Sequence, residues 1–447
     1  MNLILLSGGS GKRLWPLSND VRSKQFIKFF DDGKGNRESM VQRMYHAIER
    51  VDSDANVTIA TSKSQISELR NQLGDNIQIS LEPCRRDTFP AIALAVCYLH
   101  DVEHISEEDS VVVCPVDPYV EDDYFEALKK LYELSQEGKA NLTLLGMEPT
   151  YPSSKYGYII PKGKDNISKV SMFKEKPSEE VAKTYIDQGA LWNGGIFAFK
   201  IGYLLRKAHE LIDFKDYQDL FSKYETLEKI SFDYAVAEKE DSIQVMRFKG
   251  TWVDLGSWNT LTDALGEGSN IGNTLLSEDC KHDHIVNELD IPILCVGVSD
   301  VIVAASPEGV LVTNREGSSH IKDYVEKLNT PVMFAEKSWG EYKVIDVTAE
   351  SITRKIALSK GHHMSYHLHK RRKEVWNIIA GEGSVIIDGV KKHVKAGDVI
   401  NIDIGKKHTI IAESEHLQII EVQIGKNIDV GDKVKYDLSK EALEASL

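Results

Sequence analysis

The sequence predicts an α/β protein with three parts: a first domain built on a mixed, mostly parallel sheet, a small β-rich linker domain and a C-terminal β-barrel. Short apolar runs alternate with longer helical patterns over 1–265, which is typical of a parallel sheet covered by helices. Over 266–330 the apolar runs become short and β-like, and over 331–447 nearly every segment is strand-like and punctuated by Gly and Asp. We therefore expect three domains with these boundaries.

The elements of the first domain follow from its apolar periodicity. The run from Leu3 to Leu6 is short and continuously apolar, as expected of a buried strand, and 39–51 has the spacing of an amphipathic helix. Further strands are predicted at 56–62, 110–117, 142–149 and 243–248. In such sheets ligands bind outside the carboxyl ends of the strands, where the loop after Leu6 and the turn at Asp117 would lie.

The linker and the barrel are predicted from turn residues and short strands. Short apolar pieces over 285–314 are separated by turns at 299–300 and 307–309, and a helix ending near Lys327 follows. After residue 330 the strand-like segments are WGEYKVIDV, SITRKIAL, EVWNIIAGEGSVIIDGVKKHVKAG, DVINID, HTIIAES and HLQIIEVQ. Short strands at regular spacing indicate a small sandwich or barrel.

Composition and charge exclude several classes of function. The 447 residues carry a formal net charge of −15, which argues against a nucleic-acid surface because polyanions need a basic face. The five cysteines are scattered without a C-x-x-C pair, so neither a disulfide framework nor a cysteine zinc site is predicted. No apolar run reaches the length of a membrane span, and no signal cleavage site is present. We expect a cytoplasmic protein that binds neither nucleic acid nor membrane.

A glycine-rich loop follows the first strand. Gly8, Gly9 and Gly11 let the backbone turn tightly with its N–H groups free to face an anion. Lys12 is followed by Arg13 rather than Ser or Thr, so the P-loop pattern is broken, and the third glycine of the dinucleotide fingerprint is missing. A different kind of nucleotide loop is therefore predicted.

Charged residues near this loop indicate the ligand. Arg13 and Lys24 place two cations beside it, which suits a nucleoside triphosphate because they neutralise the charge that builds on departing pyrophosphate. Asp117 ends the run VVVCPVD, and Asp254 lies in GTWVDLGSW. Either aspartate alone is an ordinary turn residue or cap, but two carboxylates at strand ends can share a magnesium ion.

Nine motifs in register carry a family resemblance over roughly the first 330 residues. They are LSGGSGKRLWPL, SKQF, EPCRRDTFPAIALA, PVDPYV, YGYI, FKEKP, LWNGGIFAF, DYAVAEK and WVDLGSW. In order and spacing they resemble the mannose-1-phosphate guanylyltransferases of the sugar nucleotidyltransferase superfamily. The resemblance implies a Rossmann-like nucleotidyltransferase domain.

The resemblance also implies roles for individual residues. Nucleotide binding falls to Leu6, Gly8, Gly9, Gly11, Glu82, Pro83, Arg86, Asp87 and Thr88, with Glu82 and Pro83 at the base. The magnesium pair is Asp117 and Asp254, and the sugar phosphate is bound by Gly157, Glu175, Lys176 and Asn193. The catalytic set is Arg13, Lys24, Asp117, Lys176 and Asp254. The implied reaction is in-line attack of a sugar 1-phosphate oxygen on the α-phosphorus, for which positioning and charge neutralisation suffice.

Three motifs depart from the family pattern. Ser23 replaces the usual proline of P-K-Q-F, Asp87 and Phe89 replace residues of R-N-T-A-P, and Pro118 replaces the histidine of D-H. Asp87 and Phe89 would fall near the base. Guanine, or a pyrimidine as in CTP or UTP, therefore remains open as the base.

A second constellation lies in GHHMSYHLHKRRKEVWNIIAG, residues 361–381. Alternate residues of a strand share a face, so His367 and His369 would project together, with Glu374 returning on the next strand and His408 following in GKKHT. Three imidazoles and a carboxylate suit a divalent transition metal, and Zn, Fe, Mn and Ni all fit. His362 and His363 are interpreted as surface residues.

The spacing of this constellation resembles the two cupin motifs. In bifunctional members of the family such a domain is a type II phosphomannose isomerase, and RKEVW and EVQIG extend the match over about 335–438. His367 stands where that family has a glutamine ligand, and 429–435 replaces its acidic run and arginine. Isomerase activity is therefore a hypothesis for this domain.

The leading hypothesis is transfer of GMP from GTP to mannose 1-phosphate, giving GDP-mannose for surface polysaccharide and pyrophosphate. Two alternatives stay open: a transferase for another nucleotide or phosphorylated substrate, whose cupin is an isomerase, an epimerase or structural, and a noncatalytic sensor of nucleotide-sugar or metal. The expected partners are a nucleoside triphosphate and a sugar 1-phosphate. A hydrophobic cupin face would pair two chains as a homo-dimer.

Overall fold

The computed structural model describes all residues except 10–11, 20, 267, 329–331, 429 and 439–447. The chain forms two compact units. The first comprises Met1–Leu14 and Ser23–Ser269, and the second comprises Trp15–Arg22 and the chain from Asn270 onwards. The predicted boundary between residues 330 and 331 lies outside the described residues.

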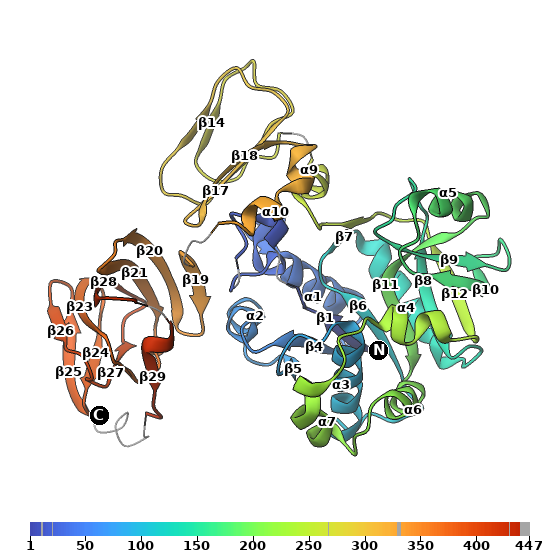
Figure 1. Ribbon diagram of the computed structural model, residues 1–447, viewed down its shortest axis with the longest axis horizontal. Coiled ribbons are helices and arrows are strands. Elements are labelled where there is room, and N and C mark those ends of the chain that lie inside the picture. The colour runs from blue at the N-terminus through green and yellow to red at the C-terminus, as the bar shows by residue number, and fades with distance from the viewer. Residues whose placement is uncertain (10–11, 20, 267, 329–331, 429, 439–447) are drawn as a thin grey trace. The chain divides into compact units, whose positions relative to one another are not determined.

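The first unit is built on a nine-stranded sheet in the order β5-β4-β1-β6-β11-β8-β12-β10-β9 (Figure 1). Among these nine strands only β10 and β11 run against the others, so the mixed, mostly parallel sheet predicted from the sequence is confirmed. The strands are β1 (Asn2–Leu6), β4 (Asn56–Ser62), β5 (Gln78–Glu82), β6 (Ser110–Pro115), β8 (Leu142–Met147), β9 (Gly157–Pro161), β10 (Ile167–Lys174), β11 (Leu191–Lys200) and β12 (Ile243–Phe248).

Helices cover both faces of this sheet, because its central strands are apolar on both sides. Ile4 belongs to one core cluster, packed under α3, and its neighbours Leu3 and Leu5 belong to the other, packed under α1 and α4. The helices of the first unit are α1 (Met40–Val51), α2 (Ile66–Leu73), α3 (Thr88–Asp101), α4 (Asp122–Gln136), α5 (Glu179–Asp187), α6 (Ile201–Leu211), α7 (Tyr217–Lys223), α8 (Phe232–Ala235) and α9 (Trp258–Leu265), the last of which packs on β13.

Helix α1 shows how local sequence sets an element. Ser39 caps it in a capping box with Gln42, which satisfies backbone N–H groups that the first turn leaves unpaired. Val41, Met44 and Ile48 are buried on one face at helical spacing. The helix predicted over 39–51 is therefore confirmed, with Ser39 as its cap.

Two short ladders lie outside the main sheet of the first unit. The first joins β2 (Lys28–Asp31) to β3 (Arg37–Ser39), and the second joins β7 (Pro118–Val120) to β13 (Trp252–Asp254). The second ladder links chain segments more than a hundred residues apart in the sequence. It determines where Asp254 lies.

The second unit begins with the β-rich linker. Its strands are β14 (Thr274–Leu276), β15 (His284–Asn287), β16 (Ile293–Cys295), β17 (Val301–Ser306) and β18 (Gly309–Asn314), followed by α10 (Lys322–Val325). Strand β14 pairs with β16, and β17 pairs with both β15 and β18.

Residues 15–22 pack with this linker although the sequence places them in the first domain. Ser306 Oγ donates to the Pro16 carbonyl at 2.6 Å, and Arg22 Nη1 lies 2.7 Å from Glu288 Oε2. At Gly309, where φ is +150°, a side chain would stand 2.7 Å from the Trp15 ring. A polar contact, an ion pair and close packing therefore hold this segment in the second unit.

The C-terminal part is a barrel of two facing sheets, as predicted. One sheet has the order β19-β20-β21-β28-β23-β26 and the other β25-β24-β27-β22-β29. The strands are β19 (Phe334–Lys337), β20 (Gly340–Val347), β21 (Ser351–Ser359), β22 (His367–His369), β23 (Arg372–Ala380), β24 (Glu382–Ile387), β25 (Val390–Lys395), β26 (Val399–Ile402), β27 (His408–Ala412), β28 (His416–Gly425) and β29 (Lys433–Lys435).

Alternate residues of these strands form the barrel core. Trp376, Val385, Ile410 and Ile419 are buried between the sheets, and each such side chain stabilises the fold by about 1.5–3 kcal/mol. Within the described ranges, every helix of the protein is too short or too polar to cross a lipid bilayer. The five cysteines are free thiols.

Candidate functional site

Asp117 and Asp254 come together beyond the carboxyl end of β6. Asp117 lies in the turn between β6 and β7, and Asp254 is the last residue of β13. Because β7 and β13 pair antiparallel with Asp254 opposite Pro118, the two aspartates meet at the same end of this ladder. Lys24 Nζ lies 2.7 Å from Asp117 Oδ2 and 4.0 Å from Asp254 Oδ1. One ammonium group therefore faces both carboxylates.

The electrostatics of this pair favour a bound cation. Burial raises the pKa of Asp254, the nearby Asp117 charge acts in the same direction, and Lys24 and Arg13 oppose them. A side chain at Gly256 would stand 3.1 Å from Asp254 Oδ2 and 3.3 Å from Arg13 Nη1, so the glycine leaves room for the guanidinium to approach the carboxylate. Two neighbouring carboxylates are also the ligand type that Mg²⁺ prefers, so the residues present fit a magnesium ion.

The glycine loop is held open by its neighbours. Gly9 has a φ of +112°, and a side chain at Gly8 or Gly9 would meet no atom within 4 Å, so conformation rather than crowding requires glycine at position 9. The Gly9 carbonyl accepts from Ser23 Oγ at 3.1 Å and from Arg85 Nη2 at 3.0 Å. At the start of the loop the Leu6 carbonyl accepts from the Val116 amide at 3.2 Å. Gly11 lies outside the described residues.

Glu82 ends β5 as a buried carboxyl. Its Oε2 accepts from the hydroxyl of Tyr224 at 2.8 Å, and burial raises its pKa. Pro83 follows it and is half-buried. The hydrogen bond fixes the orientation of Glu82 at the place predicted for the base.

The segment after Pro83 forms the start of α3. Arg86 donates to the Glu225 carbonyl, while Asp87, with a φ of +70°, accepts from the Thr88 amide at 2.8 Å as the helix cap. Thr88 Oγ1 accepts from the Phe232 amide at 2.8 Å. These three predicted nucleotide-binding residues thus make structural contacts around the helix start.

Gly157, Glu175 and Lys176 meet on the other half of the sheet. A side chain at Gly157 would collide with Glu175 Oε2, so only glycine leaves the carboxylate in place. That oxygen is buried and accepts no hydrogen bond from the described residues. Glu175 Oε1 lies 2.7 Å from Lys176 Nζ, which is half exposed. The arrangement offers a buried acceptor beside an accessible cation.

Asn193 completes this group through a partner that the sequence analysis did not assign. It lies opposite Gly157 in the β11–β9 ladder, and its Nδ2 donates to Asp233 Oδ1 at 2.6 Å. Its Oδ1 accepts from the Gly195 amide at 3.1 Å, which fixes the amide orientation. Burial, and secondly the charge of Glu175, raise the pKa of Asp233 to about 6.

His367, His369, Glu374 and His408 form a buried cluster in the barrel, and one candidate ligand atom from each lies within 4.8 Å of the others. His369 Nε2 is 3.0 Å from Glu374 Oε1, and His408 Nε2 is 3.3 Å from Glu374 Oε2. His367 Nδ1 faces the Ser365 carbonyl at 2.6 Å, and His408 Nδ1 faces the Lys406 carbonyl at 2.9 Å, so both rings turn Nε2 to the cluster. This cluster could hold a metal ion. His362 and His363 are exposed, as expected.

The groups around the cluster position its carboxylate. Trp376 Nε1 and Gln423 Nε2 donate to the two Glu374 oxygens at 3.1 and 3.2 Å. Burial lowers the pKa of His367 to about 2, which keeps its imidazole neutral. Burial also raises the pKa of Glu421 to about 8, with the Glu374 charge acting in the same direction. Imidazoles grouped around one carboxylate are the donor set of a transition-metal centre.

Comparison with known proteins assigns the first unit. The family model described as Nucleotidyl transferase matches residues 2–268, which is more than half of the chain. The chain belongs to the nucleotidyl transferase family. A second model, described as Mannose-6-phosphate isomerase C-terminal, matches residues 327–438 of this nucleotidyltransferase.

Similar proteins match nearly the whole nucleotidyltransferase. A mannose-1-phosphate guanylyltransferase of Salmonella montevideo is 29% identical over 97% of this chain and 98% of its own, and one of Escherichia coli K12 is 28% identical over 97% of both. The xanthan biosynthesis protein XanB of Xanthomonas campestris is 28% identical over 97% of both chains. A crystal structure described as mannose-1-phosphate geranyltransferase from Thermus thermophilus aligns with a TM-score of 0.63 at 29% identity, covering 74% of this chain and 99% of that one.

Three residues of the nucleotidyltransferase site were missed from the sequence. Arg85 lies in the quoted EPCRRDT motif and Asp233 in DYAVAEK, so a signal existed for both. Tyr224 lies outside every motif, and only the fold brings its hydroxyl to Glu82, 142 residues away. Arg85, rather than the predicted Arg86, contacts the glycine loop, through the Gly9 carbonyl at 3.0 Å.

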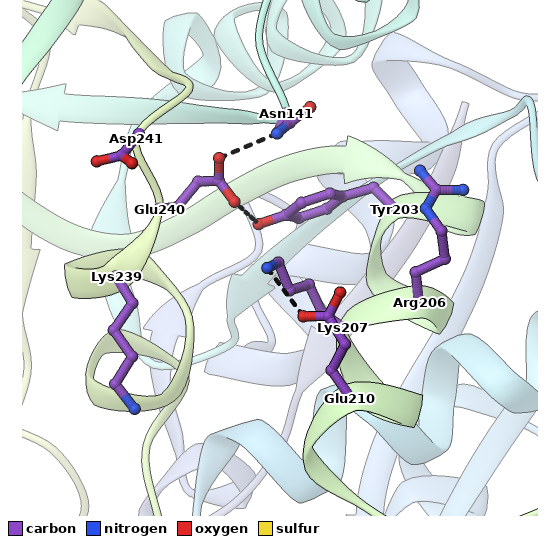
Figure 2. Close-up of a pocket in the computed structure, with 8 residues that line it drawn as sticks. All are labelled: Asn141, Tyr203, Arg206, Lys207, Glu210, Lys239, Glu240 and Asp241. Carbon is purple, nitrogen blue, oxygen red and sulfur yellow. Dashed lines mark hydrogen bonds and ion pairs between the residues drawn. The ribbon is translucent and has the colours of Figure 1, made fainter.

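A polar cavity of about 310 Å³ lies away from this chemistry (Figure 2). Asn141 and Asp241 line it just before the amino ends of β8 and β12, whereas the aspartate pair follows the carboxyl end of β6. Glu240 accepts from Tyr203 and Asn141 at 2.6 and 3.0 Å across the cavity. Much of its polar lining is therefore already paired, and none of the predicted site residues lines it.

Proposed function

We propose that this nucleotidyltransferase transfers GMP from GTP to mannose 1-phosphate, forming GDP-mannose and pyrophosphate. The observation that carries the proposal is the juxtaposition of Asp117, Asp254 and Lys24 at the strand ends beside the glycine loop. The choice of guanine and mannose is supported by the full-length similarity to mannose-1-phosphate guanylyltransferases.

In the proposed reaction a phosphate oxygen of the sugar 1-phosphate attacks the α-phosphorus of GTP. A bond forms between them, the bond to the β-phosphoryl oxygen breaks, and pyrophosphate leaves with the electron pair. The attacking phosphate is already anionic, so no strong general base is required. A magnesium ion held by Asp117 and Asp254 would neutralise charge on the reacting phosphates.

The protein's own groups perform the positioning. The open loop at Gly8 and Gly9 exposes backbone N–H groups to the triphosphate, and Arg13 and Lys24 bring positive charge to it. The unpaired Glu175 Oε2 would accept a sugar hydroxyl, and Lys176 Nζ would bind the sugar's phosphate. Holding both reactants in line supplies much of the rate enhancement.

The experiment is a pyrophosphate-release assay with mannose 1-phosphate and each of GTP, CTP, UTP and ATP. Release with GTP, and GDP-mannose as the product, is the expected result. If pyrophosphate is released only with CTP or UTP, the enzyme transfers that nucleotide and the proposal that it transfers GMP is wrong. No release with any pair of substrates would favour a noncatalytic sensor.

A second candidate function belongs to the barrel, and the observation that favours it is the buried cluster of three histidines and Glu374. We propose that this cluster binds one divalent transition metal, with Zn, Fe, Mn and Ni as candidates. Similarity to a mannose-6-phosphate isomerase model supports isomerisation of fructose and mannose 6-phosphates there. Elemental analysis of the purified protein and a coupled isomerase assay test the two parts separately. If the protein contains the metal but does not isomerise the sugar phosphates, the proposed metal site stands and the proposed isomerase activity is wrong.

A further inference from the structure

A buried chain of hydrogen bonds reaches the glycine loop from the central sheet. Thr61 on β4 donates from Oγ1 to Gln65 Oε1 at 2.7 Å, and Gln65 Nε2 donates to Ser23 Oγ at 2.7 Å. Ser23 Oγ in turn donates to the Gly9 carbonyl at 3.1 Å. Thr61, Gln65 and Ser23 are each no more than 2% exposed. These three side chains, called here the polar relay, therefore connect a strand of the sheet to the loop inside the protein.

The direction of every bond in the polar relay follows from its last acceptor. The Gly9 carbonyl can only accept, so Ser23 uses its single hydroxyl proton there. The Ser23 oxygen therefore accepts from the amide NH₂ group of Gln65, and the amide oxygen of Gln65 is left to accept from Thr61. The relay thus fixes both the amide orientation of Gln65 and the rotation of the Ser23 hydroxyl.

The polar relay restricts the loop at a glycine whose φ is +112°. The Gly9 carbonyl also accepts from Arg85 Nη2 at 3.0 Å, and two donors to one carbonyl fix the plane of its rigid peptide unit. Arg85 is exposed, so water competes for its contact, whereas water does not reach the buried Ser23 bond. A glycine-rich loop loses conformational entropy when it binds a ligand, so a loop held in place beforehand binds more tightly.

Ser23 does not use its hydroxyl to cap the short 3₁₀ helix that follows it, Lys24–Phe26. Its backbone lies at φ −82° and ψ 155°, close to the conformation of proline, which is the usual residue at this position of the motif in the family that the sequence resembles. Proline has no hydroxyl, so the polar relay depends on the departure of this chain from the motif. The Ser23 hydroxyl is available for the loop.

We propose that Ser23 and Gln65 are positioning residues for the nucleoside triphosphate, which hold the glycine loop in its binding conformation before the nucleotide arrives. The inference rests on the proposed function for the triphosphate, but not for the choice of guanine or of mannose. Both side chains act through the Gly9 carbonyl rather than by contact with the nucleotide. Loss of the polar relay should therefore weaken nucleotide binding and leave the chemical step unchanged.

The test measures pyrophosphate release by the full-length protein, with GTP and mannose 1-phosphate varied in turn. The variants are Ser23→Ala, Gln65→Leu and the double variant of both, and Ser23→Thr is the conservative variant that keeps the hydroxyl. The matched control is Ser64→Ala, because Ser64 is an exposed serine beside Gln65 whose hydroxyl meets that of Ser62 at 3.0 Å. Calorimetric titration with GTP and Mg²⁺, without the sugar phosphate, gives the Kd of the nucleotide for the same variants.

Ser23→Ala and Gln65→Leu should each raise the KM and the Kd for GTP about three- to tenfold, as expected for the loss of one buried hydrogen bond. The double variant should bind GTP no more weakly than the weaker single variant, because both changes break the same relay. The kcat and the KM for mannose 1-phosphate should stay at their wild-type values, and Ser23→Thr and Ser64→Ala should match wild type throughout. Partial unfolding lowers kcat and leaves KM unchanged, so a merely structural defect gives the opposite pattern.

The outcomes separate this proposal from the proposed function. An unchanged KM for GTP in Ser23→Ala and Gln65→Leu would overturn the positioning role while GMP transfer stands, and additive effects in the double variant would overturn the relay. If wild type releases pyrophosphate only with CTP or UTP, a raised KM for that nucleotide in the same variants supports the positioning role, and the choice of guanine is wrong. If wild type binds no nucleoside triphosphate, the positioning role and nucleotidyl transfer are both refuted.

Discussion

Replacing Asp254 by asparagine tests the aspartate pair most directly. Asp254 Oδ1 lies 4.0 Å from the cation Lys24 Nζ, and two unit charges at that distance attract by about 4 kcal/mol at an effective dielectric constant of 20. The Asp254 side chain is 39% exposed, so water screens part of this attraction. Taking an attraction of this size, reduced by screening, as the scale for a cation held by the aspartate pair, we expect Asp254→Asn to weaken transition-state stabilisation by about 2–4 kcal/mol, which lowers kcat/KM roughly 30-fold to 10³-fold.

The same substitution should leave the fold intact. Because the pKa of Asp254 is raised in the folded protein, its charged form is disfavoured there and costs free energy of folding at neutral pH. A neutral isostere removes this cost, while Lys24 keeps its 2.7 Å contact with Asp117. The Tm of the variant without ligands should therefore be equal to that of wild type or higher.

The assay is pyrophosphate release at saturating GTP and varied mannose 1-phosphate, combined with thermal unfolding. Asp122→Asn is the matched control, because Asp122 is 86% exposed at the start of α4 and its ion pair with Arg50 is a surface contact. It should change neither activity nor Tm measurably. Near-normal turnover in Asp254→Asn would refute the cation site, and lost turnover together with a lowered Tm would show that Asp254 is structural.

Three further predictions concern other parts of the site. The pKa of Asp233 is raised to about 6, so kcat/KM should rise with pH through about 6 as Asp233 becomes anionic, and Asp233→Asn should flatten that rise. The contribution of Asp233 to the free energy of unfolding should fall as the pH rises from the ordinary aspartate pKa towards 6. Gly157→Ala should raise KM for the sugar phosphate about tenfold, because the added methyl group displaces the Glu175 carboxylate. Gly163→Ala, where an added methyl group makes only ordinary contacts, should leave KM unchanged. Equal KM values for the two variants would argue against sugar binding at Glu175. His369→Ala should lose the barrel metal in elemental analysis and keep normal pyrophosphate release. His393→Ala, which changes an exposed histidine, should keep the metal. If both variants keep the metal, the metal is not bound by the histidine cluster.

Much of the fold could be predicted because it depends on local patterns. Continuous apolar runs gave the buried strands, and the strands expected at 56–62 and 243–248 have those bounds in the structure. The histidines of the barrel were grouped from the period of a strand, and the structure brings them together with Glu374 and His408. These are properties of a few consecutive residues, and backbone geometry alone relates them.

The sequence by itself determined which groups are available: a loop rich in glycine, acidic and basic side chains near it, and imidazoles two residues apart. Only the tertiary structure decided which of them meet. The β7–β13 ladder brings Asp254 to Asp117, and Asp233 reaches Asn193 across 40 residues. Such contacts depend on the pairing of distant strands, where a shift of one residue would turn every side chain to the opposite face, and no local pattern encodes that register.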